Sequence, residues 1–173
     1  WKNVRAVATT DIVTNAADYL VADKPLLLIS FARSGNSPES VAAVNLANAI
    51  CKNVAHIYIT CNKNGHLAQS ANAENILSLL LPEETDDKSL AMTSSFSTML
   101  LTCLMISQID HIEAERERIE AVAANAQAVL SDYADAIEAI AARPFERGVF
   151  LGSGPMKGIA EECHLKLQEL TDG

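Results

Sequence analysis

The sequence has few basic residues and no long apolar run, and each absence excludes a class of protein. Its 13 Lys and Arg residues are outnumbered by 22 Asp and Glu residues, which leaves a net charge of −9. General binding to nucleic acid needs a basic surface, so nucleic acid is excluded as a partner. No apolar run has the length that spans a bilayer, so we expect no membrane partner. A small anionic ligand is compatible with this composition, because its binding depends on the local field.

Paired cysteines and clustered histidines are also absent. The cysteines lie far apart in the sequence and form no C-x-x-C motif, so we interpret them as reduced core thiols of a cytoplasmic protein. They are Cys51, Cys61, Cys103 and Cys163. The histidines lack the spacing of metal ligands, and we expect no metal. The sequence starts at Trp1 without an initiator Met or a signal-peptide pattern, which indicates that it begins inside a larger protein.

The most informative stretch is ISFARSGNSPES, residues 29–40. The apolar run before it is typical of a strand buried on both faces of a parallel sheet. Ser34-Gly35-Asn36 is turn chemistry, and Ser37-Pro38 predicts the start of a helix. A loop between the carboxyl end of a strand and the amino end of a helix is where open α/β sheets bind ligands, and helix N–H groups there favour an anion. Serine hydroxyls and Arg33 would add donors for phosphate, but an ordinary capped loop facing water explains the pattern equally well.

Further strand and helix patterns alternate along the chain. We predict strands at 4–8, 56–60, 75–81 and 148–151, and helices at 12–22, 67–72 and 93–106. The acidic segment 83–87 is interpreted as a solvated connector. The entry to the helix at 93 carries more hydroxyls than capping requires, which indicates either a second polar wall of a site or a serine-rich helix start.

The last third of the sequence is predicted to be mostly helical. An amphipathic stripe over 112–142 predicts one long helix packed on a neighbour, and its Ala content disfavours a coiled coil. Gly152-Ser153-Gly154 then leads into a helix from Pro155, without the third glycine of a dinucleotide site. On that helix Glu162, Lys166 and Glu169 share one face, and spacing alone favours a salt-bridged solvent face.

Three segments together resemble the sugar isomerase (SIS) family. They are ISFARSGNSPES, AMTSSFSTM and LGSG…LKLQELT, and the resemblance is to the branch of tagatose-6-phosphate ketose/aldose isomerases and galactosamine-6-phosphate deaminases. It implies an α/β fold, a three-layer α-β-α sandwich with a parallel sheet, followed by the start of a second SIS domain. We expect a first domain over 1–110 that lacks its leading strand and loop, a connecting helix over 111–145, and the opening of the second domain over 146–173.

The resemblance also assigns roles to single residues. It places the phosphate on the loop of Arg33, Ser34, Gly35, Asn36 and Ser37. It places the sugar beside Thr93 and Ser94, and it makes Glu169 the catalytic base with Lys166 as its neighbour on the helix. This reverses the expectation from spacing alone for Glu169.

The implied activity is a cofactor-free aldose–ketose isomerisation of a sugar phosphate, in which one carboxylate moves a proton between C2 and C1. For galactosamine 6-phosphate, hydrolysis of the resulting imine would release ammonia and tagatose 6-phosphate. The alternative from another class is a regulator whose SIS module senses a sugar phosphate without turnover. The isolated chain would be incomplete as an enzyme, and the apolar surface left bare by missing parts predicts a homo-oligomer, a dimer being expected.

Overall fold

The computed structural model describes residues 3–172 of the chain. It divides into two compact units, Trp1–Cys103 and Leu104–Gly173. The finer division into segments 1–110, 111–145 and 146–173 stays a prediction.

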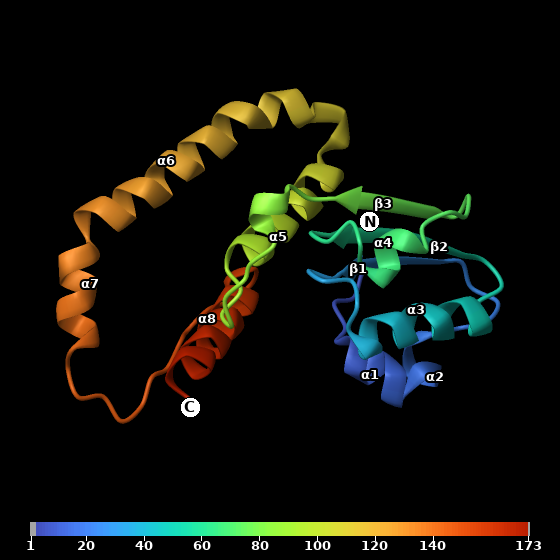
Figure 1. The fold of residues 1–173 in the computed structure, drawn as a ribbon, viewed down its shortest axis with the longest axis horizontal. Coiled ribbons are helices and arrows are strands. Elements are labelled where there is room, and N and C mark those ends of the chain that lie inside the picture. The colour runs from blue at the N-terminus through green and yellow to red at the C-terminus, as the bar shows by residue number, and fades with distance from the viewer. Residues whose placement is uncertain (1–2, 173) are drawn as a thin grey trace. The chain divides into compact units, whose positions relative to one another are not determined.

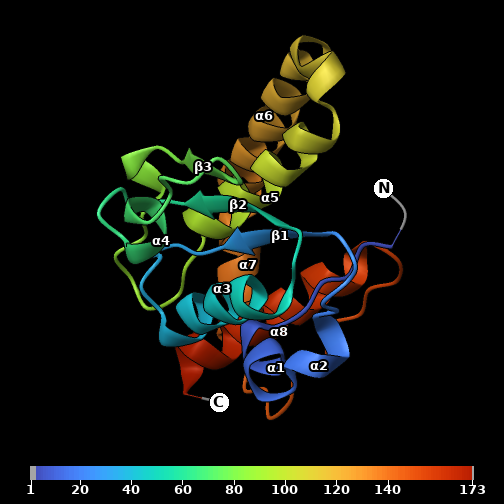
Figure 2. The same ribbon diagram turned by 90° about the vertical axis from the view of Figure 1, so that its right-hand side faces the viewer.

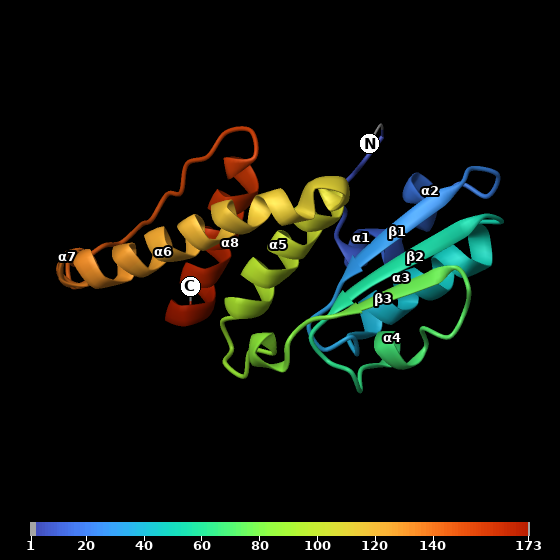
Figure 3. The ribbon, with the colours of Figure 1, turned by 90° about the horizontal axis from the view of Figure 1, so that it is seen from above.

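The first unit is built around a parallel sheet (Figure 1). Strands β1 (Leu26–Phe31), β2 (Val54–Thr60) and β3 (Ile76–Leu80) are hydrogen-bonded in the order β1-β2-β3, with Leu28 opposite His56 and His56 opposite Ile76. Figure 3 shows the three strands side by side. Because the strands run in the same direction, their carboxyl ends meet at one edge. The predicted α/β class with a parallel sheet is confirmed, and β2 and β3 lie within two residues of their predicted bounds.

Helix α3 (Pro38–Ile50) covers one face of this sheet, and α1 (Thr9–Thr14) and α2 (Ala16–Tyr19) lie beyond it (Figure 2). The face of α3 toward the core is made of small side chains, including Ala43 and Ala47, which let the helix approach closely. The helix predicted at 12–22 is wrong in its extent. It starts earlier and breaks into two short helices.

A second cluster of buried side chains supports the carboxyl edge of the sheet. Ala32, Val44, Tyr58 and Leu67 pack together, and Leu67 belongs to the short helix α4 (His66–Gln69). A 3-10 turn η1 (Glu83–Thr85) follows β3. The loops that follow β1 and β2 are thereby attached to a rigid part of the core.

Two predicted strands are absent among the residues that the structure describes. Residues 4–8 are irregular and lead directly into α1, and residues 148–151 are irregular and lead toward α8. Val4 is 67% exposed and Leu151 is 89% exposed. An apolar stretch becomes a strand only where a sheet edge satisfies its backbone groups, and neither segment pairs with β1, β2 or β3.

The remaining residues are helical. Helix α5 (Ser94–Ser107) spans the boundary between the units, and the second unit holds η2 (Ile109–Glu115), α6 (Arg116–Asp132), α7 (Ala134–Ala141) and α8 (Met156–Thr171). The single helix predicted over 112–142 is thus wrong. Within 112–142, residues 112–115 belong to the 3-10 helix η2, and the backbone leaves helical geometry at Tyr133, between α6 and α7. Within residues 3–172, no helix is both long and apolar enough to cross a membrane.

Candidate functional site

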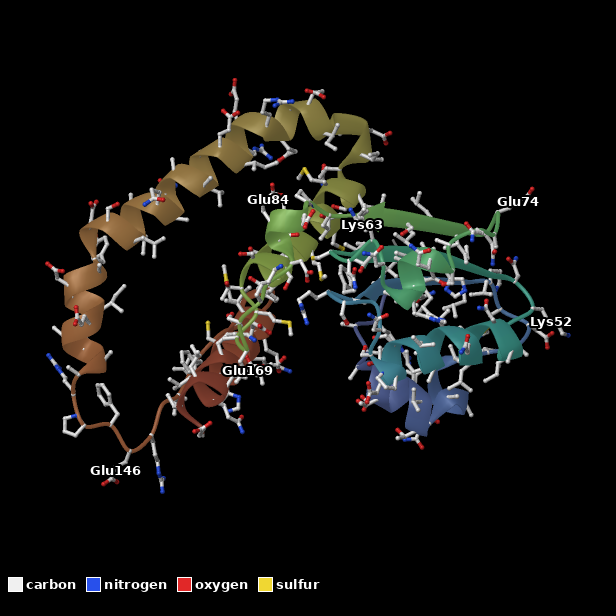
Figure 4. The ribbon with its side chains drawn as sticks, viewed as in Figure 1. Lys52, Lys63, Glu74, Glu84, Glu146 and Glu169 are labelled. Atoms are coloured by element: carbon white, nitrogen blue, oxygen red, sulfur yellow. The ribbon has the colours of Figure 1, made fainter. Side chains whose placement is uncertain are left out.

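Polar loops follow all three strands at the carboxyl edge of the sheet. They cover residues 32–37 after β1, 61–65 after β2 and 81–87 after β3. In Figure 4, Lys63 and Glu84 mark this edge, whereas Lys52 and Glu74 mark the opposite one. Ligands of open parallel sheets bind at the carboxyl ends of the strands, so the sequence-predicted loop lies in the expected place.

The loop from Arg33 to Ser37 is held along its backbone by the end of β2, the loop that follows it and helix α4. The Thr60 hydroxyl donates to the Arg33 carbonyl at 3.2 Å, and the Asn62 amide donates to the Ser34 carbonyl at 3.0 Å. The Leu67 N–H donates to the Gly35 carbonyl at 3.2 Å. Because the carbonyls already have partners within the protein, the loop is preorganised before any ligand binds.

Gly35 is required by the backbone of this loop. Its φ of +65° lies in the left-handed region, where a side chain costs about 1–2 kcal/mol. Asn36 accepts a hydrogen bond from the His66 N–H at 2.8 Å through its side-chain oxygen. The amide of Asn36 thus fixes the turn, a positioning role in addition to the ligand contact that the resemblance implies.

The start of helix α3 has the properties of an anion site. Ser37 is the N-cap residue and Pro38 the first helical residue, as predicted. The Ser37 hydroxyl, however, donates to the Ser40 hydroxyl at 2.7 Å, so in the described part of the chain no side chain caps this helix. N–H groups at an uncapped helix start are donors suited to a phosphate.

Arg33 is held in place by the loop after β3. Its Nη1 atom donates to Oδ1 of Asp86 at 3.0 Å and to the carbonyl of Asp87 at 2.9 Å. The Arg33 and Asp86 side chains are each 29% exposed, so the ion pair is partly shielded from water. The pair uses one of the two terminal nitrogens of a guanidinium that has five N–H donors.

The carboxylate of Asp87 caps helix α5. Oδ2 accepts from the N–H of Thr93 at 3.0 Å and the N–H of Ser95 at 2.8 Å, and Oδ1 accepts from the N–H of Ser94 at 3.2 Å. The Ser95 hydroxyl adds a further bond at 2.8 Å. These bonds, above all the one from the Ser95 N–H, lower the pKa of Asp87 to about 2.

The contacts of Asp86 and Asp87 correct the interpretation of 83–87 as a solvated connector. Asp86 binds Arg33, and Asp87 joins the Arg33 loop to the Thr93–Ser94 segment, because its carbonyl accepts from Arg33 and its carboxylate from the N–H groups of Thr93 and Ser94. Neither residue was predicted from the sequence to belong to the site. The available signal was an Asp, a strong capping residue, placed shortly before a serine-rich helix start.

Glu169, labelled in Figure 4, and Lys166 both belong to helix α8 of the second unit. Lys166 Nζ lies 2.5 Å from Oε2 of Glu169 and 3.4 Å from Oε1 of Glu162. The hydrogen bond to Glu169 is the main cause of a raised pKa for Lys166. The shared face predicted from their spacing is confirmed, and all three side chains are between 20 and 28% exposed.

These observations describe a parallel α/β domain with a serine-rich, anion-suited loop at its carboxyl edge. The SIS domain family model matches residues 2–108, and the chain belongs to this family. The resemblance found in the sequence is therefore confirmed.

Several relatives match nearly the whole chain. The D-galactosamine-6-phosphate deaminase AgaS of Escherichia coli is 49% identical over 99% of this chain, and that of Shewanella sp. (strain ANA-3) is 44% identical over 99%. The crystal structure of tagatose-6-phosphate ketose/aldose isomerase from Escherichia coli matches with a TM-score of 0.90 and 49% identity, over 99% of this chain. The matches cover 45%, 44% and 46% of these three proteins, so the chain spans less than half the length of each.

Proposed function

We propose that the whole protein is an aminosugar-phosphate deaminase/isomerase that converts galactosamine 6-phosphate and water into tagatose 6-phosphate and ammonia. The observation that carries the proposal is the 49% identity to a galactosamine-6-phosphate deaminase along essentially the whole chain, combined with the preorganised loop at an uncapped helix start. The loop and the helix start would form the anion site, and the relatives with this fold are named for sugar-phosphate substrates.

The phosphate would bind at the start of α3. Arg33 would provide charge and Ser34 a neutral donor, and Ser37 would become a second donor only by turning its hydroxyl away from Ser40, to which it donates at 2.7 Å. Thr93 and Ser94 are exposed at the start of α5 and would face the sugar hydroxyls. Binding energy from the phosphate, remote from the reacting carbons, would position C1 and C2 for proton transfer.

Glu169 would take the proton from C2 of the open-chain sugar and return it to C1. With a 2-amino sugar this transfer leaves an imine at C2, and its hydrolysis forms the ketone and releases ammonia. Because Lys166 contacts Glu169 at 2.5 Å, its ammonium would have to turn aside, toward Glu162 or a substrate oxygen, before Oε2 can receive the proton. No cofactor is needed for these steps.

The setting of the enzyme is part of the proposal. We infer a cytoplasmic protein, because its free cysteines suit a reducing compartment. We also infer a homo-oligomer, a dimer being the expected form, because the described residues carry many exposed large apolar side chains.

The test is ammonia release from galactosamine 6-phosphate by the whole protein and two variants. Glu169→Gln should reduce kcat by at least about 100-fold, the contribution typical of a general base. Glu161→Gln is the matched control, because Glu161 lies on the same helix and forms an exposed ion pair with Lys157. Its kcat should stay within about twofold of the unmodified protein.

The outcomes separate the two classes of function. Loss of turnover in Glu169→Gln alone supports the enzyme and the role of the carboxylate. If the whole protein binds the sugar phosphate but releases neither ammonia nor ketose, it is a sensor and the enzymatic proposal is wrong.

A further inference from the structure

Helix α6 of the second unit carries an apolar seam that the described part of the chain leaves uncovered. The seam consists of Ile119, Val122, Ala126 and Val129, which follow one another by three, four and three residues and therefore share one face. Within residues 3–172, no residue of α6 is buried, and Val122 and Val129 are 68% and 49% exposed. A seam with this spacing is the contact face of a helix that packs against a second helix.

Three polar residues border the seam on one side, a base at one end, an acid at the other and an amide midway. They are Arg118, Asn125 and Asp132, each seven residues from the next. If the seam packs against an antiparallel copy of itself, Arg118 of each copy lies beside Asp132 of the other, and the two Asn125 side chains face each other. A parallel pair would place Asn125 beside Leu130 and would form no charge pair, so the polar border favours the antiparallel arrangement.

The apolar side chains fit the same antiparallel register. In it Ile119 lies across from Val129 of the other copy, and Val122 lies across from Ala126. The small side chain of Ala126 lets the two helices approach closely near the centre of the contact. The Ala content that disfavours a long coiled coil therefore suits a short pair of single helices.

We propose that the α6 seam is a contact surface between two copies of the protein, which pair antiparallel and are aligned by Arg118 and Asp132. This inference rests on the proposed function only in that it assigns a surface to the proposed homo-oligomer. Arg118 binds Glu115 through Nη1, at 3.1 Å, which leaves its second terminal nitrogen for Asp132 of the other copy. Asp132 has no ion pair among the described residues.

The alternative occupant of the seam is the part of the whole protein outside these residues. The chain spans less than half the length of its relatives, so this alternative has to be tested. A segment of different sequence would bury the apolar side chains without matching the two charges. A second copy supplies an acid and a base at the spacing of Arg118 and Asp132, because it carries the same two residues.

The test measures the dissociation constant of the dimer by sedimentation equilibrium of the whole protein. Ala126→Glu places a carboxylate in the seam, and it should raise this constant at least about 100-fold, because the buried charge has no partner there. Ala124→Glu is the matched control, since it makes the same substitution on the side of α6 that faces away from the seam. Its dissociation constant should stay within about twofold of that of the unmodified protein.

An exchange of charges tests the antiparallel register. Arg118→Asp and Asp132→Arg each bring like charges together at both ends of the contact, and each should raise the dissociation constant about tenfold. The double variant exchanges the two charges, which restores opposite charges at both positions and keeps the net charge. Its dissociation constant should return to within about twofold of that of the unmodified protein.

The outcomes separate the seam from the proposed homo-oligomer and from the proposed enzyme. A dimer that dissociates equally in Ala126→Glu and Ala124→Glu has its contact elsewhere, which overturns the inference and leaves the homo-oligomer in place. A whole protein that is monomeric at every concentration, with a lower Tm in Ala126→Glu alone, covers the seam with its own chain and overturns both. Ammonia release is not part of this test, so failure of the proposed enzyme leaves its result unchanged.

Discussion

Gly65 is the position where a single methyl group should most disturb the loop of residues 33–37. A Cβ at this residue would overlap the backbone carbonyl oxygen of Ser34 and would lie 3.1 Å from that of Asn62. Both atoms belong to the backbone, so the overlap is relieved only if the two loops move apart. We therefore expect Gly65→Ala to separate residues 33–37 from residues 61–67.

The size of the effect follows from the hydrogen bonds that join the two loops. Asn62 binds the Ser34 carbonyl at 3.0 Å, the Leu67 N–H binds the Gly35 carbonyl at 3.2 Å, and the His66 N–H binds the Asn36 side chain at 2.8 Å. At about 1 kcal/mol net for each bond, their loss costs about 2–3 kcal/mol. For a chain of this size that lowers Tm by about 4–12 °C.

Thermal unfolding by circular dichroism measures this change, with Gly158→Ala as the control. Gly158 lies inside α8, where a Cβ would meet nothing within 4 Å, so the alanine should stabilise the helix by about 0.5–1 kcal/mol. KM for the sugar phosphate should rise only in Gly65→Ala. A Tm for Gly65→Ala within about 1 °C of the unmodified protein would show that the two loops tolerate the added methyl group.

Three further predictions concern charge. Folding lowers the pKa of Asp87 from its ordinary value to about 2, so the stability that its carboxylate adds to the fold is complete above about pH 4 and is lost as the pH falls toward 2. Acid unfolding of Asp87→Asn should lack this loss of stability. Burial lowers the pKa of His56, which is 1% exposed, so the contribution of its neutral ring to folding stability is complete above about pH 6.5 and declines below it. Tm should therefore fall between pH 7 and pH 5, and it should fall less in His56→Gln. A rise in Tm over this range would contradict the prediction. Lys52→Ala breaks only an exposed pair and should change the free energy of unfolding by less than about 0.5 kcal/mol in urea, a larger loss being incompatible with its exposure.

Local signals in the sequence were sufficient for the loop after β1. Each signal occupies only a few consecutive residues. The apolar run predicted β1, the turn residues predicted the turn at Gly35, and the Ser-Pro pair predicted the start of α3. The spacing of Lys166 and Glu169 likewise sufficed to place them together, because a helix fixes which residues are neighbours.

The features that were missed depend on partners distant in the sequence. Residues 4–8 and 148–151 have the composition of strands, yet a strand needs a sheet edge, and composition does not reveal whether one is within reach. The pairing of Arg33 with Asp86 joins positions 53 residues apart. Its prediction would have required knowing that the ends of β1 and β3 meet at one edge. Asp87 acts closer in sequence, but its acidic neighbours concealed it as part of a solvated charge run.

The central claim is tested most directly by the products formed from galactosamine 6-phosphate. The whole protein is incubated with this substrate, and ammonia and tagatose 6-phosphate are both quantified over time. We expect both products to appear together in equal amounts, and both to be lost in Glu169→Gln. Substrate that binds and is recovered unchanged, or ammonia release that survives in Glu169→Gln, would contradict it.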